Sequence, residues 1–384
     1  MKHVALKADS FVLAGRLAQG GWLEIDGGCF VGWRPDKPSC EILDYGGCIV
    51  APGFVDTHIH GFAGHDVMDC NPAGIDELCC ALAQSGTTSW VPTTLTASAE
   101  QTEAACASVA ESCAKRSDGF LGAKTQGIFL EGPFFTEEHK GAQNPAYMCD
   151  PSYELLMRWQ AAAHGLIKKS ALAPERSGSC DYIAQASRAG VVTAIGHTSA
   201  SYDEAMRAVD AGASVFVHTF NGMDEISHRH PGVVGAALMA RHATAELICD
   251  GVHVHPVSCE LLIRTKGWEH VALISDALSC AGLAEGNYVL GELPIELRHD
   301  AAYLRDSGNL AGSTLTLAQA VKNVVAWGMV SWEQAIRMAS EVPARSCGIQ
   351  DVCGSIAAGR SADCVILTPN MELEATFVSG QRLP

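Results

Sequence analysis

The sequence contains no apolar run that approaches 18 residues, so we expect no membrane-spanning helix. Its first residues, MKHVALKADSF, lack the apolar stretch of a secretory signal peptide. The sixteen cysteines include no Cys-x-x-Cys pair, and they do not suggest the disulfide framework of a small secreted domain. These features predict a cytoplasmic protein that uses cysteine as a small core residue.

Positive charge is also scarce. Lys and Arg number 26 against 43 Asp and Glu, which gives a formal net charge of −17. Binding to nucleic acid needs a basic surface that displaces counterions, so we expect no nucleic-acid partner. An anionic small substrate needs only one or two local basic residues and is compatible with this charge.

The two ends of the chain have the character of small β-structures. Residues 1–50 and 355–384 contain short alternating segments, and glycine pairs at 20–21, 27–28 and 46–47 separate them as in antiparallel hairpins. Neither end can bury a core alone. We therefore predict one small β-sandwich domain that is built from residues 1–50 and 355–384 together.

Between the ends, short apolar segments alternate with helical stretches. Eight segments read as strands, and seven of them follow a helix: GFVDTHI, TTSWVP, GIFLEG, KKSALA, VVTAIG, SVFVHT, AELICD and VALISD. This alternation implies parallel pairing. We predict an α/β fold with a TIM-like (β/α)₈ barrel over residues 51–354. Residues 281–312 are expected to form a hairpin over its mouth, which ends in a glycine-containing turn.

Polar residues gather at the carboxyl ends of these strands, where barrel enzymes place their working groups. His58 and His60 are two residues apart, so both point to the same face of a strand. Further polar residues follow later strands: Glu131, His197, His218 and Asp276. Imidazole and carboxylate groups that converge in this way suit a divalent metal such as zinc.

Each of these residues also has a simpler explanation when it is taken alone. An isolated His197 or His218 is more often a hydrogen-bonded core histidine than a metal ligand. Glu131 is harder to explain as a structural residue, because a carboxylate among Phe129 and Leu130 needs a charge partner. The joint arrangement, rather than any single residue, predicts a metal site.

The chain resembles the amidohydrolase superfamily, and its finer motifs are similar to those of one branch, the N-acetylglucosamine-6-phosphate deacetylases. The motifs span residues 51–367 in order: APGFVDTHIHG, GHDVMD, LEGPF, KGAQNP, GHT, HTFNGM, RHPGVVGA, DGVHV, SDA, LAGSTLTL and GSIAAGRSADCVIL. The resemblance implies removal of the acetyl group from N-acetylglucosamine 6-phosphate, which yields glucosamine 6-phosphate and acetate in amino-sugar catabolism.

The resemblance also implies roles for the strand-end residues. A principal metal is expected on Glu131, His197 and His218, and a second on His58 and His60. Some relatives replace that histidine pair and use one metal, so one or two divalent ions per subunit are expected. Zinc is the first choice, and iron, manganese and cobalt are alternatives. Asp276 matches the catalytic acid and base.

Substrate contacts implied by the resemblance are Ala142, Gln143, Asn221, Gly222, Arg229, His253, Leu310, Ala311 and Gly312. The matching arginine reaches across a two-fold interface in the family, so a homodimer is expected in which Arg229 contributes to the neighbouring site. The alternative for Arg229 is a solvated basic loop, and His253 could instead orient a metal ligand. Gln143 replaces a histidine found in some relatives and cannot carry charge.

Two other functions remain open. One is a dihydropyrimidinase-like or deaminase amidohydrolase. Many ring-opening relatives use a lysine after the fourth strand to bridge two metals, but Lys168 and Lys169 lie at the start of that strand. Glu131 could bridge instead. The other is a metal-stabilised scaffold that has lost catalysis, although the predicted constellation contains no missing member.

Overall fold

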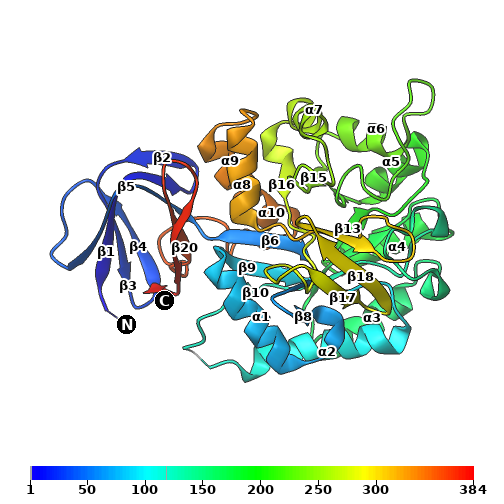
Figure 1. Ribbon diagram of the computed structural model, residues 1–384, viewed down its shortest axis with the longest axis horizontal. Coiled ribbons are helices and arrows are strands. Elements are labelled where there is room, and N and C mark those ends of the chain that lie inside the picture. Colours follow the sequence, from blue (N-terminus) through cyan, green and yellow to red (C-terminus); the bar gives the residue numbers. More distant parts are fainter. Residues whose placement is uncertain (1, 118) are drawn as a thin grey trace.

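The computed structural model describes residues 2–117 and 119–384. It has a smaller β-rich part, which contains both ends of the chain, and a larger part in which helices surround strands (Figure 1). Within the described ranges, no helix combines the length and apolar character needed to cross a bilayer. The sixteen cysteines are all free thiols, and half of them are buried, as expected for a small core residue.

The β-rich part is one eight-stranded sheet that combines both ends of the chain. Its strands are β1 (Val4–Leu13), β2 (Arg16–Gln19), β3 (Trp22–Asp26), β4 (Cys29–Arg34), β5 (Glu41–Pro52), β20 (Cys364–Leu367), β21 (Leu373–Val378) and β22 (Gln381–Arg382). The order is β22-β21-β20-β5-β1-β3-β4, and β2 pairs with β1. Leu6, Phe11 and Val50 share a buried cluster with Ile366 and Phe377, so the two ends of the chain form a common core.

The consecutive pairs β1–β2 and β3–β4 are antiparallel hairpins, as predicted, but this sheet also contains one parallel pair that the sequence did not predict. Strands β1 and β5 run parallel, with Val4 opposite Glu41 and Phe11 opposite Val50. They can do so because β2, β3 and β4 lie between them in the chain, and this connection is long enough for β5 to return in the direction of β1.

The larger part contains all eight predicted strands. They are β6 (Phe54–Ile59), β9 (Thr87–Pro92), β11 (Ile128–Leu130), β12 (Ile167–Leu172), β13 (Val192–Ile195), β14 (Val215–Phe216), β15 (Thr244–Leu247) and β16 (Val271–Leu273). The seven predicted helices are α1 (Pro72–Gln84), α2 (Ala99–Lys115), α3 (Tyr153–Ala162), α4 (Ser179–Arg188), α5 (Tyr202–Ala211), α6 (Gly232–Met239) and α7 (Pro256–Lys266). Helices α8 (Leu317–Ala326), α9 (Trp332–Met338) and α10 (Glu341–Ser346) follow.

Parallel pairing organises these strands in two sheets. Strands β11 to β16 pair in sequence order, and β6 pairs with β9, which also pairs with the short β10 (Lys124–Thr125). A parallel bridge between Thr93 and Phe129 joins the sheets on one side. On the other side, Asp276 N donates to His58 O and His60 N donates to Ala277 O, both at 2.9 Å. The carboxyl ends of the first and last strands therefore lie side by side.

Local sequence signals explain where several helices begin. Ser201 and Glu204 form a reciprocal capping box at the start of α5, and Asn71 caps α1 directly before a proline. His255 caps α7 by accepting a hydrogen bond from Val257 N. These caps hold the helix starts in the loops that follow the carboxyl ends of the strands.

The segment predicted to cover the mouth forms a three-stranded antiparallel sheet. Its strands are β17 (Gly286–Leu290), β18 (Leu293–Arg298) and β19 (Ala301–Leu304). The β17–β18 hairpin is fastened to the loop that follows β11, because Glu292 accepts hydrogen bonds from Asn144 and Tyr147 at 2.8 and 3.2 Å. Figure 1 shows this hairpin lying across the strands of the larger part.

Candidate metal centre and active site

The six polar residues predicted at strand ends come together at one buried point. His58 belongs to β6, and His60 follows that strand directly. The others follow β11, β13, β14 and β16 within three residues: Glu131, His197, His218 and Asp276. All six are buried, and Asp276 is the most exposed at 8%. The structure thus assembles a set that spans more than two hundred residues of chain.

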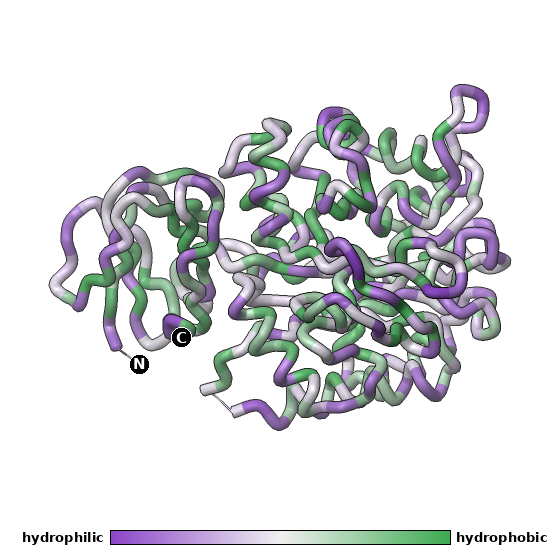
Figure 2. Tube along the Cα trace, in the orientation of Figure 1, coloured by the Kyte–Doolittle hydropathy of each residue, from purple (hydrophilic) through white to green (hydrophobic). Residues whose placement is uncertain are grey.

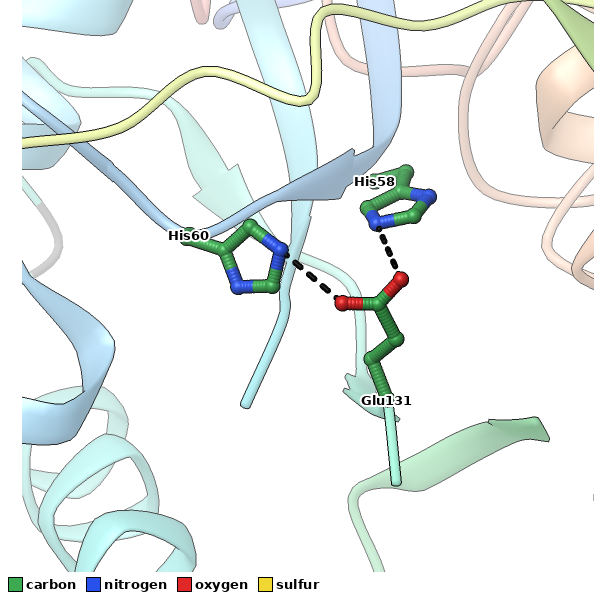
Figure 3. A group of neighbouring side chains, drawn as sticks. All are labelled: His58, His60 and Glu131. Atoms are coloured by element: carbon green, nitrogen blue, oxygen red, sulfur yellow. Dashed lines mark ion pairs between the residues drawn. The ribbon is translucent and has the colours of Figure 1, made fainter. Parts of the chain in front are cut away.

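Glu131 lies at the centre of this set. Its Oε1 is 3.2 Å from His58 Nε2, 3.3 Å from His197 Nε2 and 3.2 Å from His218 Nε2. Its Oε2 is 3.1 Å from His60 Nε2. Figure 3 shows His58 and His60 pointing from one strand toward the same carboxylate. The expectation that these two imidazoles share a face is confirmed.

These side chains form two groups that could each hold a metal ion. One is His58, His60 and Glu131, and the other is Glu131, His197 and His218, with ligand atoms within 4.8 Å of one another in each group. His58 Nε2 is buried, and although it lies 3.2 Å from Glu131 Oε1 it makes no well-aligned hydrogen bond among the described residues. Imidazole nitrogens around a shared carboxylate match the ligand set of catalytic zinc and related divalent ions. The residues therefore fit two ions that share Glu131.

Charge pairing shifts the pKa values of this cluster in opposite directions. Burial alone would raise the pKa of Glu131, but the charge of His58 and hydrogen bonds from His197 and His218 hold it well below its usual range. Burial would lower the pKa of His58, but the charges of Glu131 and Asp276 raise it to about 9. The pKa of His60 is raised well above its usual value by the same two carboxylates. Without metal, the acids are ionised and protons occupy these two imidazoles.

Asp276 lies beside the histidine pair. Its Oδ1 is 3.3 Å from Nε2 of both His58 and His60. Burial would raise its pKa, but the charge of His58 and the hydrogen bond of His60 lower it, so the carboxyl is ionised at neutral pH. An ionised carboxylate at this place can accept a proton from a group bound in front of it.

Three residues of the centre have left-handed backbone conformations. The φ angles are 47° at His197, 25° at His218 and 52° at Asp276. Few residues other than glycine adopt such angles, and the surrounding structure must hold them in place. Here each of them lies two or three residues after its strand ends, His197 and His218 contact Glu131, and Asp276 contacts His58 and His60.

A cavity of about 140 Å³ opens in front of the centre. Eight of the nine predicted substrate contacts line it: Ala142, Gln143, Asn221, Gly222, His253, Leu310, Ala311 and Gly312. Glu131, His60 and Asp276 also line it, so the metal groups and the proposed acid and base face the same space. Leu290 of the β17–β18 hairpin forms part of its wall.

Arg229, the ninth predicted contact, is not among the residues that line this cavity. It is exposed on the loop between β14 and α6, which projects outward in Figure 1 and is hydrophilic in Figure 2. An ion pair between His139 and Asp224, at 2.9 Å, ties the start of this loop to the loop after β11. Arg229 therefore lies away from the cavity of its own chain.

Two cavity residues are held by hydrogen bonds that sequence reasoning missed. His253 Nδ1 lies 2.6 Å from Asp250 Oδ2, while its Nε2 is buried with no partner among the described residues. Gln143 Oε1 accepts from Thr96 N at 2.7 Å, and its Nε2 donates to Glu131 Oε2 at 2.9 Å. The amide of Gln143 is thus oriented toward the metal groups as well as the cavity.

Comparison with known proteins identifies the family. The model of the family described as "Amidohydrolase family" matches residues 49–383. The chain belongs to the amidohydrolase family. It is 39% identical over 341 residues to N-acetylglucosamine-6-phosphate deacetylase of Vibrio furnissii, covering 89% of this chain and 84% of that protein. It is 36% identical over 370 residues to N-acetylgalactosamine-6-phosphate deacetylase of Escherichia coli O157:H7, covering 95% and 96%.

The solved structures of amidohydrolases that it resembles include an N-acetyl-D-glucosamine-6-phosphate deacetylase of Mycobacterium smegmatis. That protein is an aspartate-to-alanine mutant in complex with N-acetyl-D-glucosamine-6-phosphate. The TM-score is 0.93 at 33% identity, and the match covers 100% of this chain and 99% of the other. The chain is therefore similar to these enzymes over its whole length, including the β-rich part.

Two further charged residues lie beside this candidate centre, and sequence reasoning gave neither of them a role there. Lys169 and Glu246 are fully buried on β12 and β15, and Glu246 contacts His58. The signal that pointed to Glu131 applies to both, because each is a single charge within an apolar strand. Lys169 is the third residue of β12 and contacts Glu246 rather than Glu131, in agreement with the prediction that it lies toward the start of its strand.

Proposed function

We propose that this amidohydrolase is a metal-dependent deacetylase of amino-sugar catabolism. It hydrolyses the acetyl amide of N-acetylglucosamine 6-phosphate to glucosamine 6-phosphate and acetate. The observation that carries the proposal is the convergence of four imidazole Nε2 atoms on Glu131, with Asp276 beside them. The names of the relatives, at 39% identity and below, supply the substrate.

The proposal includes the finer architecture. We infer that the eight parallel strands close as a TIM-like (β/α)₈ barrel over residues 51–354, with a small domain of residues 1–50 and 355–384. The backbone hydrogen bonds between residues 58–60 and 276–277 support closure, because they join the first strand to the segment after the last. A barrel would place all the strand-end ligands on one rim.

Glu131, His197 and His218 would hold one divalent ion, and His58, His60 and Glu131 a second. Zinc is our first choice from the ligand chemistry, and iron, manganese and cobalt also accept these donors. When bound, such an ion polarises the acetyl carbonyl and lowers the pKa of water. His58 and His60, which are protonated without metal, must then each lose a proton as metal is loaded.

Asp276 performs the proton transfers in this proposal. Its ionised carboxylate takes a proton from the attacking water and then delivers that proton to the amide nitrogen. The second transfer is necessary because an amine leaves poorly unless it is protonated. The amide of Gln143, already oriented by Thr96 N, can donate a hydrogen bond to a group in the cavity.

Phosphate recognition would fall to His253, to Asn221 and the backbone N–H of Gly222, and to Arg229 of a second copy. Asp250 holds His253 Nδ1, which leaves Nε2 to face the cavity and meet the substrate. Arg229 is exposed and absent from its own cavity, as expected if it serves a neighbour in a homodimer. Ile226 on the same loop is 50% exposed and would be covered by such contact.

We also infer a cytoplasmic location. Sixteen free thiols support it, because a reducing compartment keeps cysteines in that form.

Acetate release tests the activity most simply. The zinc-loaded protein is expected to release acetate from N-acetylglucosamine 6-phosphate, and to hydrolyse free N-acetylglucosamine and a dihydropyrimidine far more slowly. Ring opening of the dihydropyrimidine without acetate release would favour the other amidohydrolase reaction. Arg229→Ala is expected to remove most of the preference for the phosphorylated sugar, by roughly 10- to 100-fold for a lost charged hydrogen bond. An unchanged preference would contradict its role.

N-acetylgalactosamine 6-phosphate is a second candidate substrate. The relative named for it is 36% identical and matches 96% of its own length. The two sugars differ only in the configuration of one hydroxyl group, so the same acetate assay with both, compared by kcat/KM, decides which one the cavity prefers. The metal groups and Asp276 would act identically on either.

A further inference from the structure

A buried chain of charged groups lies behind His58, on the side away from the cavity. Lys169 Nζ donates to Glu246 Oε1 at 2.5 Å, and Glu246 Oε2 lies 3.0 Å from His58 Nδ1. The side chains of Lys169, Glu246 and His58 are all 0% exposed. The chain therefore runs from the strand interior directly to one of the proposed metal ligands.

Lys169 is fixed by more than its ion pair. Its Nζ also donates to the carbonyl of Thr57 at 2.7 Å and lies 3.7 Å from the centre of the Phe129 ring. These contacts come from β6 and β11, the strands that carry or precede His58 and Glu131. Lys169 is thus held in one position by three neighbouring elements, and it holds Glu246 in turn.

Stability alone does not account for this pair. A buried ion pair loses two hydration shells, and well-packed apolar residues of similar size are often as stabilising or more so. A buried pair that also touches a proposed ligand calls for a functional explanation, and here that explanation is geometric.

The contacts of His58 determine which of its two nitrogens keeps a lone pair that can bind a metal. A neutral imidazole carries its proton on one nitrogen and a lone pair on the other. Glu246 is an acceptor at Nδ1, so it keeps the proton there and leaves the lone pair of Nε2 facing Glu131 and Asp276. Carboxylates that hold the outer nitrogen of a ligating histidine in this way also fix the ring orientation.

We propose that Lys169 and Glu246 form a positioning pair that holds His58 in its metal-ligating form and thereby sets the metal affinity of the His58–His60 position. Lys169 acts by keeping Glu246 charged and in place, and Glu246 acts on His58. The inference rests on the metal assignment made above. It predicts that the pair controls one of the two metal positions and leaves the other, at His197 and His218, unaffected.

The test compares two double variants with the wild-type protein. Lys169→Met with Glu246→Leu removes the acceptor and both charges while keeping the interior apolar. Lys169→Met with Glu246→Gln also removes both charges but keeps an amide oxygen as an acceptor for Nδ1–H. Zinc affinity of each position is measured by competition with a chelator, and the number of bound ions by elemental analysis.

The expected result is a 10- to 100-fold weaker affinity for one of two zinc ions in the leucine variant, the range found when a supporting residue is lost. The glutamine variant is expected to recover part of that loss. Lys266→Met is the matched control, because Lys266 is also a buried lysine but donates to the carbonyls of Ala240 and Ala243, away from the centre. It should bind both ions as the wild type does.

A second readout needs no metal. In ¹⁵N NMR of the metal-free protein at about pH 10, where His58 is largely neutral, a larger share of its proton is expected on Nδ1 in the wild type than in the leucine variant, in which Glu131 and Asp276 at Nε2 are the remaining carboxylates. Unchanged zinc affinity and an unchanged proton position in the leucine variant would overturn the proposal, as would equal losses in both double variants. A wild-type protein that binds no metal but keeps the Nδ1 proton would contradict the metal assignment and support the role of Glu246.

Discussion

The two halves of the proposed metal centre are built in different ways, although both include Glu131. In the half formed by His58 and His60, which we call the acid half, both imidazoles contact Asp276, and His58 also contacts Glu246. In the half formed by His197 and His218, the carbonyl half, His197 Nδ1 donates to the backbone carbonyl of His139 at 2.8 Å. One half depends on buried charges and the other on the position of a loop.

The difference has a consequence for metal binding. Buried carboxylates keep protons on the imidazoles of the acid half when no metal is present, so an ion must displace those protons. The carbonyl of His139 carries no charge. Its position depends on the loop that contains the short helix η2 (Glu137–His139). We therefore expect the acid half to respond to pH and to buried charges, and the carbonyl half to respond to changes in that loop.

Glu131→Gln should weaken both halves together, because both lose their shared anionic ligand. We expect metal affinity to fall at both positions by more than the roughly 100-fold seen when only a supporting residue is changed. Acetate release should fall below detection. Elemental analysis and the acetate assay check this result, with the exposed Glu154→Gln on α3 as control. Retention of one tightly bound ion would show that the halves do not share Glu131.

Asp276→Asn should separate catalysis from binding within the acid half. We expect kcat to fall by on the order of 10²–10⁴, the usual range for loss of a general acid and base, while KM changes little. The carbonyl half should keep its ion, since Asp276 pairs with His58 and His60. Steady-state kinetics on the metal-loaded variant measure both kcat and KM. Near-normal turnover would remove Asp276 from the proposed role.

Metal loading should depend on pH mainly in the acid half. The pKa of His58 is raised to about 9, so below that pH its proton competes with the metal. Both His58 and His60 must lose a proton, so we expect affinity at this position to rise by up to about a hundredfold per pH unit from pH 7 and less steeply above pH 9. Zinc titrations at several pH values measure this slope. A pH-independent affinity would mean that His58 is not a ligand.

The raised pKa of His58 also makes the stability of the metal-free protein depend on pH. Stability should fall as pH rises, whereas metal affinity should rise. A pKa raised above the unfolded value stabilises the fold at low pH, and that contribution is lost as pH rises through the folded value. For His58 the window runs from about 6.5 to about 9. The melting temperature of the metal-free protein should therefore fall across this window, while that of the zinc-loaded protein should fall less.

Asp224→Ala should have the smallest effect, and only in the carbonyl half. Asp224 pairs with His139 and is half exposed, so the pair is expected to contribute about 1 kcal/mol or less. Zinc affinity at His197 and His218 should weaken less than about fivefold. Glu225→Ala, a neighbouring exposed carboxylate, is the matched control. An equal effect on the acid half would contradict the separation of the two halves.

Much of the site could be predicted from the sequence because it depends on regular spacing. Residues i and i+2 of a strand share a face, which predicted the convergence of His58 and His60. The alternation of strands and helices predicted that Glu131, His197 and His218 would meet, because parallel strands bring their carboxyl ends together. These inferences needed only the period of each element.

The rest depends on contacts that have no sequence period. The parallel pairing of β1 with β5 depends on how a long connection returns, and nothing local specifies it. Lys169 and Glu246 are 77 residues apart and are recognisable as partners only once the strands are assembled. The two hydrogen bonds of Gln143 follow from one rotamer of its side chain. Sequence patterns placed Gln143 at the cavity but could not show what its amide contacts.

Anomalous X-ray diffraction from zinc-soaked crystals tests the central claim most directly. We predict two peaks on either side of Glu131, one bounded by His58 and His60 and the other by His197 and His218, with the carboxylate of Glu131 contacting both. Peaks elsewhere in the chain, or a Glu131 carboxylate that contacts neither ion, would contradict the account.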